Sequence, residues 1–126
     1  MIAEKNMPVG TKVAKWEGYI VDSYEKVPKK LKLYAILIDE KRFLVPENDC
    51  MFANHSCDPN CEVNEELEIV TIKPVNKGQE LVYDYAICEN DEQDLMEWNH
   101  EWDFKCKCGS KKCRKNIDRY YYPKII

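Results

Sequence analysis

The sequence predicts a mostly β protein of the α+β class, in which several short sheets are combined with little helix. Three observations support this prediction. Apolar runs are only a few residues long and rich in β-branched or aromatic residues, polar turn segments separate them, and a single segment shows helical periodicity. With 126 residues the chain has the length of one domain and can bury one core without disulfides.

Five segments are predicted to be strands, because each combines apolar residues with β-branched or aromatic ones. In chain order they cover residues 11–21, 31–39, 41–46, 67–75 and 80–86. The first is a strand or one arm of a hairpin, and a polar connector at 24–30 separates it from the second. A charged Asp-Glu-Lys turn joins the second to the third, and the fourth ends near Pro74, before the turn Asn-Lys-Gly.

One segment near the end of the chain predicts a short helix. Asn90 is a suitable N-cap, and Gln93, three residues later, completes a capping box. Leu95, Trp98 and Trp102 then recur at helical spacing. We therefore expect a helix that begins after Asn90 and includes Trp102.

The formal net charge is −4, which argues against the broad basic surface of a protein that binds duplex nucleic acid. An acidic protein is compatible with a basic partner such as a lysine-rich peptide. The charges are unevenly distributed, since residues 89–103 contain seven acids and no lysine or arginine, whereas residues 104–119 contain seven bases and one acid. For either run alone, a solvated surface is the simplest interpretation.

Seven cysteines are many for this length, and their number is odd. The N-terminus has no apolar segment of the kind found in secretory signals, so we expect an intracellular protein, in the cytoplasm or the nucleus. No apolar run is long enough to span a membrane. Reduced thiols and metal binding therefore explain the cysteines better than a disulfide framework does.

Three of the cysteines, Cys106, Cys108 and Cys113, form a Cys-x-Cys-x4-Cys cluster around a Gly-Ser turn. Thiolates two positions apart can face one ion where the backbone turns sharply, and Gly109 permits such a turn. A structural Zn²⁺ commonly takes four cysteine ligands, so a fourth ligand must come from elsewhere in the chain. The candidates are Cys50, Cys57, Cys61, Cys88 and His100.

The segment Asn-His-Ser-Cys-Asp-Pro-Asn-Cys, residues 54–61, is ambiguous by itself. Its adjacent histidine and serine would point apart, which disfavours a nucleophile and base, and a tight turn is the simplest interpretation. Tyr83 and Tyr85 are two positions apart in a predicted strand, so they lie on one face. They form either a cross-strand aromatic contact or the lining of a narrow channel.

Taken together and in this order, the motifs resemble those of SET-domain protein lysine methyltransferases that carry a post-SET zinc motif. Residues 48–60 match part of the pattern GN.ARF.NHSCDPN, residues 72–85 match I..GEEL..DY, residues 104–117 match F.C.CG...CRG.L, and residues 7–20 resemble the upstream pattern I..GT.V..Y.GE.I. The resemblance implies a SET domain over residues 1–103, with a pseudoknot-like core. It implies a zinc-binding post-SET segment over residues 104–126.

The resemblance also implies an S-adenosylmethionine-dependent enzyme of the EC 2.1.1 class. Such an enzyme methylates a lysine of a protein or peptide substrate, which includes histone-like proteins. Tyr85 would be the active-site tyrosine, Tyr83 would restrict the number of methyl groups, and Trp16 would line the lysine channel. The implied cofactor contacts are Asn54, His55, Tyr34, Phe104 and Ile117. The implied zinc ligands are Cys57, Cys106, Cys108 and Cys113. Neither nucleic acid nor a membrane is an implied partner.

The chain departs from the family pattern in ways that leave two further hypotheses open. The pattern begins with a Gly-x-Gly strand, and no two of the four glycines here have that spacing. A non-catalytic SET-like module with structural zinc would bind a basic peptide through the acidic residues 89–103. A zinc-ribbon-like nucleic-acid binder would use the basic residues 104–119, although the net charge counts against it.

Overall fold

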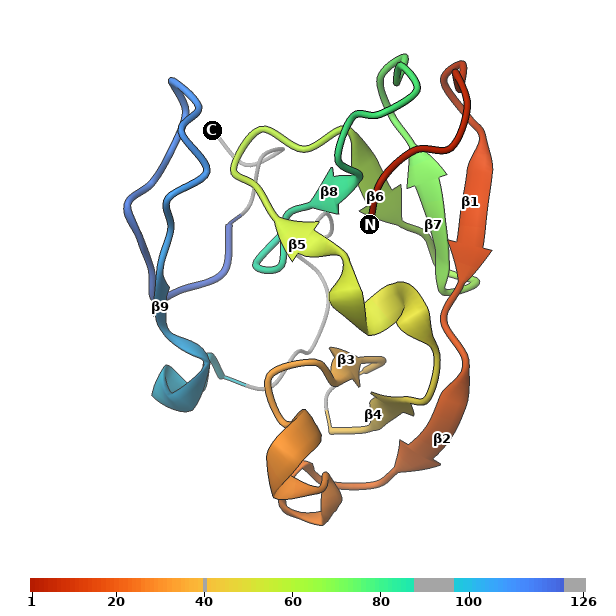
Figure 1. Cartoon of the computed structure of the whole chain (residues 1–126). Coiled ribbons are helices and arrows are strands. Elements are labelled where there is room, and N and C mark those ends of the chain that lie inside the picture. The colour runs from red at the N-terminus through yellow and green to blue at the C-terminus, as the bar shows by residue number, and fades with distance from the viewer. Residues whose placement is uncertain (40, 88–96, 122–126) are drawn as a thin grey trace.

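The computed structural model describes residues 1–39, 41–87 and 97–121 (Figure 1). Within these residues the chain forms ten short strands, arranged in four small sheets, and four 3-10 helices. The predicted fold class, mostly β with several short sheets and little helix, is therefore confirmed. No helix among the described residues is both long and apolar enough to cross a membrane.

The first sheet has the strand order β1-β7-β6 and is antiparallel throughout. It consists of β1 (Lys12–Lys15), β7 (Glu68–Thr71) and β6 (Cys61–Val63). Burial alternates along the central strand β7, where Ile69 and Thr71 are buried and Glu68 and Val70 are only half-buried. This alternation is typical of a strand with one face on the core.

The second sheet has the order β2-β4-β3, with β2 (Gly18–Val21), β4 (Phe43–Pro46) and β3 (Ile36–Leu37). All four residues of the central strand β4 are buried. At Gly18 the two backbones approach so closely that a Cβ would lie 1.9 Å from the carbonyl oxygen of Val45. Only glycine can occupy this position without moving a strand.

Four of the five predicted strands differ from the structure, since residues 67–75 contain only the strand Glu68–Thr71 and residues 80–86 only the strand Val82–Tyr83. Residues 11–21 form two strands in different sheets, because Trp16 turns into the core between them and its amide donates to the Leu67 carbonyl at 2.7 Å. Within residues 31–39 only β3 is a strand. The connector before it contains the 3-10 helices η1 (Tyr24–Lys26) and η2 (Lys29–Leu31).

The third sheet is a parallel pair that joins two motifs distant in sequence. It consists of β5 (Asn54–His55), which follows the 3-10 helix η3 (Asp49–Phe52), and β8 (Val82–Tyr83). The side chain of Asn60 braces the pair, since its oxygen accepts from the Val82 amide at 3.0 Å and its nitrogen donates to the Glu80 carbonyl at 2.9 Å. The sequence did not predict β5, because two residues carry no periodic pattern.

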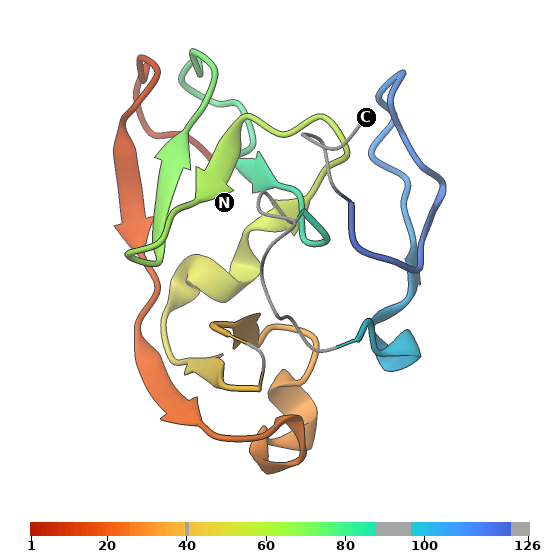
Figure 2. The ribbon, with the colours of Figure 1, turned by 180° about the vertical axis from the view of Figure 1, so that it is seen from behind.

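The fourth sheet pairs β9 (Phe104–Lys105) with β10 (Asn116–Ile117) and closes a segment that we call the cysteine loop, residues 104–117. In both Figure 1 and Figure 2 this loop and the β1-β7-β6 sheet lie at opposite sides of the molecule, with β5 and β8 between them. Of the predicted helix, Asn90, Gln93 and Leu95 lie outside the described residues. The described part contains only the single turn η4 (His100–Trp102).

Three apolar clusters hold these sheets together. The central core consists of Ala3, Trp16, Leu44, Cys50, Ala53, Cys61, Ile69, Val75 and Leu81. A second cluster lies under the cysteine loop and contains Cys57, Ala86, Cys106 and Ile117. A third, with Val27, Phe43 and Val45, lies under the second sheet. Residues 54–58 follow η3 out of the central core and end in the second cluster, so they connect the two.

Candidate active site and metal centre

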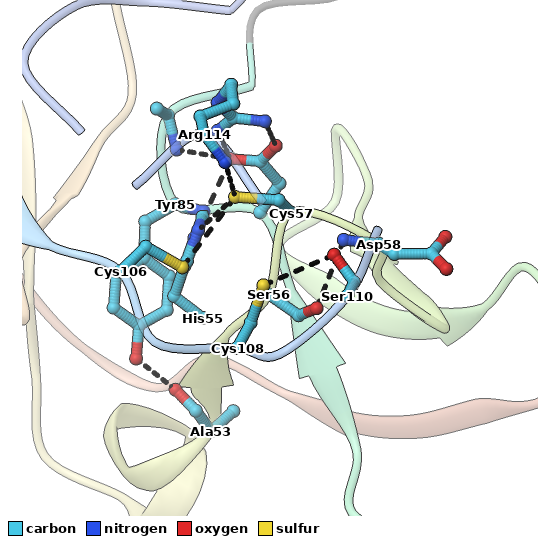
Figure 3. Close-up of polar contacts among 12 residues, drawn as sticks. Ala53, His55, Ser56, Cys57, Asp58, Tyr85, Cys106, Cys108, Ser110 and Arg114 are labelled. Carbon is cyan, nitrogen blue, oxygen red and sulfur yellow. Dashed lines mark hydrogen bonds and ion pairs between the residues drawn. The ribbon is translucent and has the colours of Figure 1, made fainter. Parts of the chain in front are cut away.

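The parallel pairing of β5 and β8 places residues 54–58 beside residues 82–86, next to the cysteine loop (Figure 3). The pairing continues past β5, since the Ser56 amide donates to the Tyr83 carbonyl at 3.1 Å. The chain then turns, because the Asp58 amide donates to the Ser56 hydroxyl at 3.0 Å and proline follows. This turn directs Cys57 towards the loop.

Four cysteine side chains meet where the turn faces the loop. The sulfur atoms of Cys57, Cys106, Cys108 and Cys113 all lie within 4.8 Å of one another. The sulfurs of Cys57 and Cys106 are 3.7 Å apart, close to the roughly 3.8 Å that separates two thiolates on one tetrahedral zinc ion. Of the other candidates for a fourth ligand, His100 is exposed and its Nδ1 atom lies 3.1 Å from the Asp103 carboxylate. Cys50 and Cys61 are in the central core, and Cys88 is outside the described residues.

The surroundings of these thiols change their acidities in opposite directions. Burial raises the pKa of the Cys57 thiol, and it raises that of Cys106 to about 12. The Ser110 hydroxyl, 3.3 Å from the sulfur, lowers the pKa of Cys108 to about 5. Four thiolates at this spacing would repel one another, so their joint ionisation requires a divalent cation. The donor set and its spacing therefore fit a structural zinc ion.

Two charged residues lock the cysteine loop onto the segment after β8. The guanidinium of Arg114 donates to both carboxylate oxygens of Asp84, each at 2.9 Å, and the Asp84 side chain is 1% exposed. The backbone amide of Arg114 donates to the Cys57 sulfur at 3.3 Å. Sequence reasoning missed this pair. The signal that could have revealed it was the position of Asp84 between the two tyrosines and of Arg114 directly after Cys113.

Three aromatic side chains that the sequence singled out lie together. The ring centroids of Tyr83 and Tyr85 are 4.8 Å apart, and Trp16 meets Tyr83 edge-to-face at 6.3 Å. Trp16 is 3% exposed, and its indole nitrogen has no hydrogen-bond partner within the described part of the chain. Tyr85 is 39% exposed and its hydroxyl donates to the Ala53 carbonyl oxygen.

Both phenols keep their protons at neutral pH. Burial raises the pKa of Tyr85 to about 12, with smaller contributions from Tyr34 and Glu80. Burial raises the pKa of Tyr83 further still. The two hydroxyls can therefore donate hydrogen bonds or accept them, but they cannot serve as strong bases.

Two of the five cofactor candidates lie directly beside these tyrosines. The His55 side chain is 4% exposed and contacts Tyr85 edge-to-face at 5.3 Å. Phe104, which is half-buried, contacts His55 at 5.0 Å and Tyr85 at 6.0 Å. The structure thus brings together residues from β5, the turn after β8, and β9.

The other three candidates lie in different surroundings. Asn54 is exposed and donates to the Glu80 carboxylate at 2.6 Å. Tyr34 is 41% exposed. Ile117 is 2% exposed and packs in the cluster with Cys57 and Cys106. A role of any of the five in binding a cofactor stays a prediction.

Comparison with known proteins identifies relatives for this architecture. A family model described as "SET domain" matches residues 1–86. Human histone-lysine N-methyltransferase 2B is 26% identical over 135 residues, covering 94% of this chain and 5% of the relative. Human histone-lysine N-methyltransferase SETD2 is 31% identical over 131 residues, covering 89% of this chain and 5% of the relative. The chain thus spans about a twentieth of the length of these relatives.

A solved structure shares the fold. The crystal structure of KRYPTONITE in complex with mCHG DNA and SAH superposes with a TM-score of 0.64 at 24% identity, covering 91% of this chain and 26% of that chain. A second crystal structure of KRYPTONITE contains mCHH DNA, an H3(1–15) peptide and SAH, and it superposes with a TM-score of 0.65. At this identity the likeness establishes the fold alone.

Proposed function

Because this chain belongs to the SET domain family, we propose that it is a protein-lysine N-methyltransferase that uses S-adenosylmethionine. The observation that carries the proposal is the parallel pairing of β5 with β8, which places Tyr83 and Tyr85 beside His55 and Phe104. The names of the relatives, which are histone-lysine methyltransferases, support the same activity.

The proposed chemistry uses the aromatic residues to prepare the substrate amine. A free lysine has a pKa of about 10.4 and must lose its proton before it can attack. Trp16 and Tyr83, whose rings are 6.3 Å apart, would supply apolar walls that disfavour the ammonium form. The Tyr85 phenol and the Ala53 carbonyl then orient the neutral amine, and such positioning can supply roughly 7–11 kcal/mol. When bound, S-adenosylmethionine supplies the electrophilic methyl group.

The remaining assignments concern the cofactor contacts, the number of methyl groups added, the metal ligands and the domain limits, and they follow from the family resemblance. Asn54, His55, Tyr34, Phe104 and Ile117 are the proposed cofactor contacts, and Tyr83 favours the addition of few methyl groups. Cys57, Cys106, Cys108 and Cys113 would hold one structural zinc ion. Residues 1–103 would form the SET domain and residues 104–126 the post-SET segment.

The proposed substrate is a lysine-containing protein or peptide of the histone type. This follows from the names of the relatives and from the H3 peptide in one KRYPTONITE structure. The KRYPTONITE structures also contain DNA. For this chain we propose a protein partner alone, because its formal net charge is −4. A histone substrate implies an intracellular location.

Calorimetric titration with S-adenosylmethionine, followed by methyl transfer to a panel of histones and lysine-rich peptides, tests the proposal. We expect saturable cofactor binding and methylation that Tyr85→Phe lowers at least tenfold, since the phenol no longer orients the amine. Tyr19→Phe, which changes a phenol on the edge strand β2, should leave the rate unchanged. An absence of cofactor binding at saturating concentration would contradict the enzyme proposal.

A second candidate function is a non-catalytic SET-like module. The acidic run of residues 89–103, which contains seven acids and no lysine or arginine, favours it. Within the acidic residues 89–103, Glu97, Glu101 and Asp103 are described and exposed, so they could face a basic peptide. Peptide binding that weakens with salt but is unaffected by Tyr85→Phe and by S-adenosylmethionine would support this candidate over the first.

A further inference from the structure

The imidazole of His55 lies between Tyr85 and the sulfur of Cys57 (Figure 3). On one side the backbone amide of Tyr85 donates to its Nδ1 atom at 3.0 Å. On the other side its Nε2 atom lies 3.5 Å from the sulfur of Cys57. The side chain is 4% exposed, so these two contacts account for both ring nitrogens in a site closed to solvent.

The two contacts determine which nitrogen carries the proton. A backbone amide can only donate, so Nδ1 of His55 must accept from the Tyr85 amide and carries no hydrogen. The proton of the neutral ring is therefore on Nε2, which points at the Cys57 sulfur. A thiolate held by a metal ion accepts such a bond more strongly than a neutral thiol does.

The surrounding groups hold the ring in this orientation. Phe104 and Tyr85 contact it edge-to-face at 5.0 Å and 5.3 Å. The Asp84 carboxylate lies 3.7 Å from Nδ1, beyond hydrogen-bond distance, and is already bound by Arg114 and by the Ala86 amide. Arg114 in turn donates its amide to the Cys57 sulfur at 3.3 Å. The ring has no other polar partner in the described part of the chain.

We propose that His55 is a positioning residue that couples metal binding at Cys57 to the placement of Tyr85. With the metal bound, Cys57 is fixed and its sulfur accepts a hydrogen bond from Nε2 of His55. This contact orients the ring so that Nδ1 accepts from the Tyr85 amide. When the metal is removed, Cys57 is no longer anchored and the ring loses one of its two fixed points. The link to catalysis rests on the proposed function, whereas the link between the metal and the Tyr85 backbone does not.

The inference also changes what His55 can do for a cofactor. Both nitrogens are used within the protein, so the imidazole has no free polar atom to offer a ligand. Any polar contact of His55 with a cofactor would come from its backbone.

Nuclear magnetic resonance of the metal-loaded protein tests the link directly. The chain has only two histidines, so 15N-histidine labelling yields signals from two imidazole rings, and His100, whose side chain is 77% exposed, is the internal reference. We expect His55 to be protonated on Nε2 alone. With 113Cd in place of zinc, we expect scalar coupling from the metal through the Cys57 sulfur to that proton. Protonation on Nδ1, or no coupling with cadmium bound, would overturn the proposal.

Two variants separate the halves of the link. His55→Gln keeps a donor near Cys57 but places no acceptor at the position of Nδ1, whereas His55→Asn keeps an acceptor near Nδ1 but cannot reach the sulfur. In the zinc-loaded protein, His55→Gln should speed hydrogen exchange of the Tyr85 amide about tenfold. His55→Asn should leave the Tyr85 amide protected and speed zinc loss to a chelator severalfold. His100→Gln should change neither rate.

The amide of Ile69 in the first sheet reports on the fold, and its exchange rate should be equal in every variant. Equal exchange of the Tyr85 amide in wild type and His55→Gln would refute the coupling. These measurements do not require methyl transfer. A protein without methyltransferase activity would refute the proposed function, and the exchange and metal-loss rates would still decide whether His55 couples the metal to Tyr85. With an active protein, His55→Gln should lower kcat and leave the peptide KM unchanged.

Discussion

Tyr85 acts as a hydrogen-bonding group because its phenol stays neutral. Its hydroxyl donates to the Ala53 carbonyl, and burial raises its pKa to about 12. An ordinary tyrosine has a pKa of about 10. The folded protein thus binds this proton more tightly than the unfolded chain does. The stability that the neutral phenol contributes therefore falls as the pH rises.

The stability that the neutral Tyr85 phenol contributes should be fully present below about pH 10 and lost as the pH rises through about 12. Chemical denaturation between pH 8 and 12 measures this loss. Tyr85→Phe has no ionisable hydroxyl, so its stability should fall less steeply over that window. Tyr19→Phe, at a residue 44% exposed, is the control. Equal slopes for wild type and Tyr85→Phe would contradict the assignment.

The ion pair of Asp84 and Arg114 should contribute strongly to stability, because the Asp84 side chain is 1% exposed and both of its oxygens accept from Arg114. Removing one partner of a buried pair leaves an uncompensated charge. We expect Asp84→Asn to lower the free energy of unfolding by about 3 kcal/mol. The surface pair of Lys73 with Asp58 offers a control, since Asp58→Asn should cost less than about 1 kcal/mol. Similar costs for both variants would show that burial does not strengthen the Asp84 pair.

Among the elements, the second sheet depends on one glycine. Strand β2 is an edge strand whose residues Tyr19 and Ile20 are exposed, so it contributes little apolar burial of its own. Its backbone instead approaches β4 at Gly18, where the Val45 carbonyl leaves no room for a side chain. Backbone proximity, and not side-chain packing, therefore sets the position of β2.

Gly18→Ala should lower the free energy of unfolding by roughly 3 kcal/mol, because the added Cβ would collide with a backbone oxygen that cannot rotate away. Thermal and denaturant unfolding measure the change. Ile20→Ala, at an exposed residue of the same strand, should change the stability by less than about 1 kcal/mol. A Gly18→Ala variant as stable as the wild type would show that β2 can shift at no cost.

At the scale of the whole molecule, the candidate site lies where the β5-β8 pair meets the cysteine loop. The β1-β7-β6 sheet and the cysteine loop lie at opposite sides, and the β5-β8 pair connects them (Figures 1 and 2). The strands that close the loop, β9 and β10, have only two residues each. So short a pair has little stability of its own, and the loop therefore depends on the cysteine cluster and on the Asp84 ion pair.

Removing the metal should open the cysteine loop while the first sheet stays folded. Metal analysis should find about one zinc per chain. Chelation, or Cys57→Ser, should expose the lysines of residues 105–115 to trypsin. The lysines of β1 should stay protected, and mass spectrometry of the fragments distinguishes the two. Cys61→Ala alters a buried thiol outside the cluster and should keep the metal. If Cys57→Ser retains zinc, Cys88 becomes the better candidate for the fourth ligand.

Several features of the molecule could be predicted because they are local in the chain. Short apolar runs separated by turns indicated small sheets, and the spacing of Cys106, Cys108 and Cys113 indicated a metal-binding loop. Tyr83 and Tyr85 were expected on one face of a strand, and their rings are 4.8 Å apart, although Tyr85 lies in the turn after β8 and not in a strand. Each of these features depends on backbone periodicity or on a turn within a few residues, which the order of amino acids expresses directly.

The rest of the site depends on residues that are far apart in the chain. The break of residues 11–21 at Trp16, the parallel β5-β8 pair and the ion pair of Asp84 with Arg114 all require the folded chain. The sequence by itself determined the fold class and, through local spacing, three of the four clustered cysteines, whereas Cys57 was named as the fourth through the family resemblance alone. Only the tertiary structure brought Cys57 to the cluster and His55 between Cys57 and Tyr85, because such contacts arise from the burial of a common core and leave no periodic trace in the sequence.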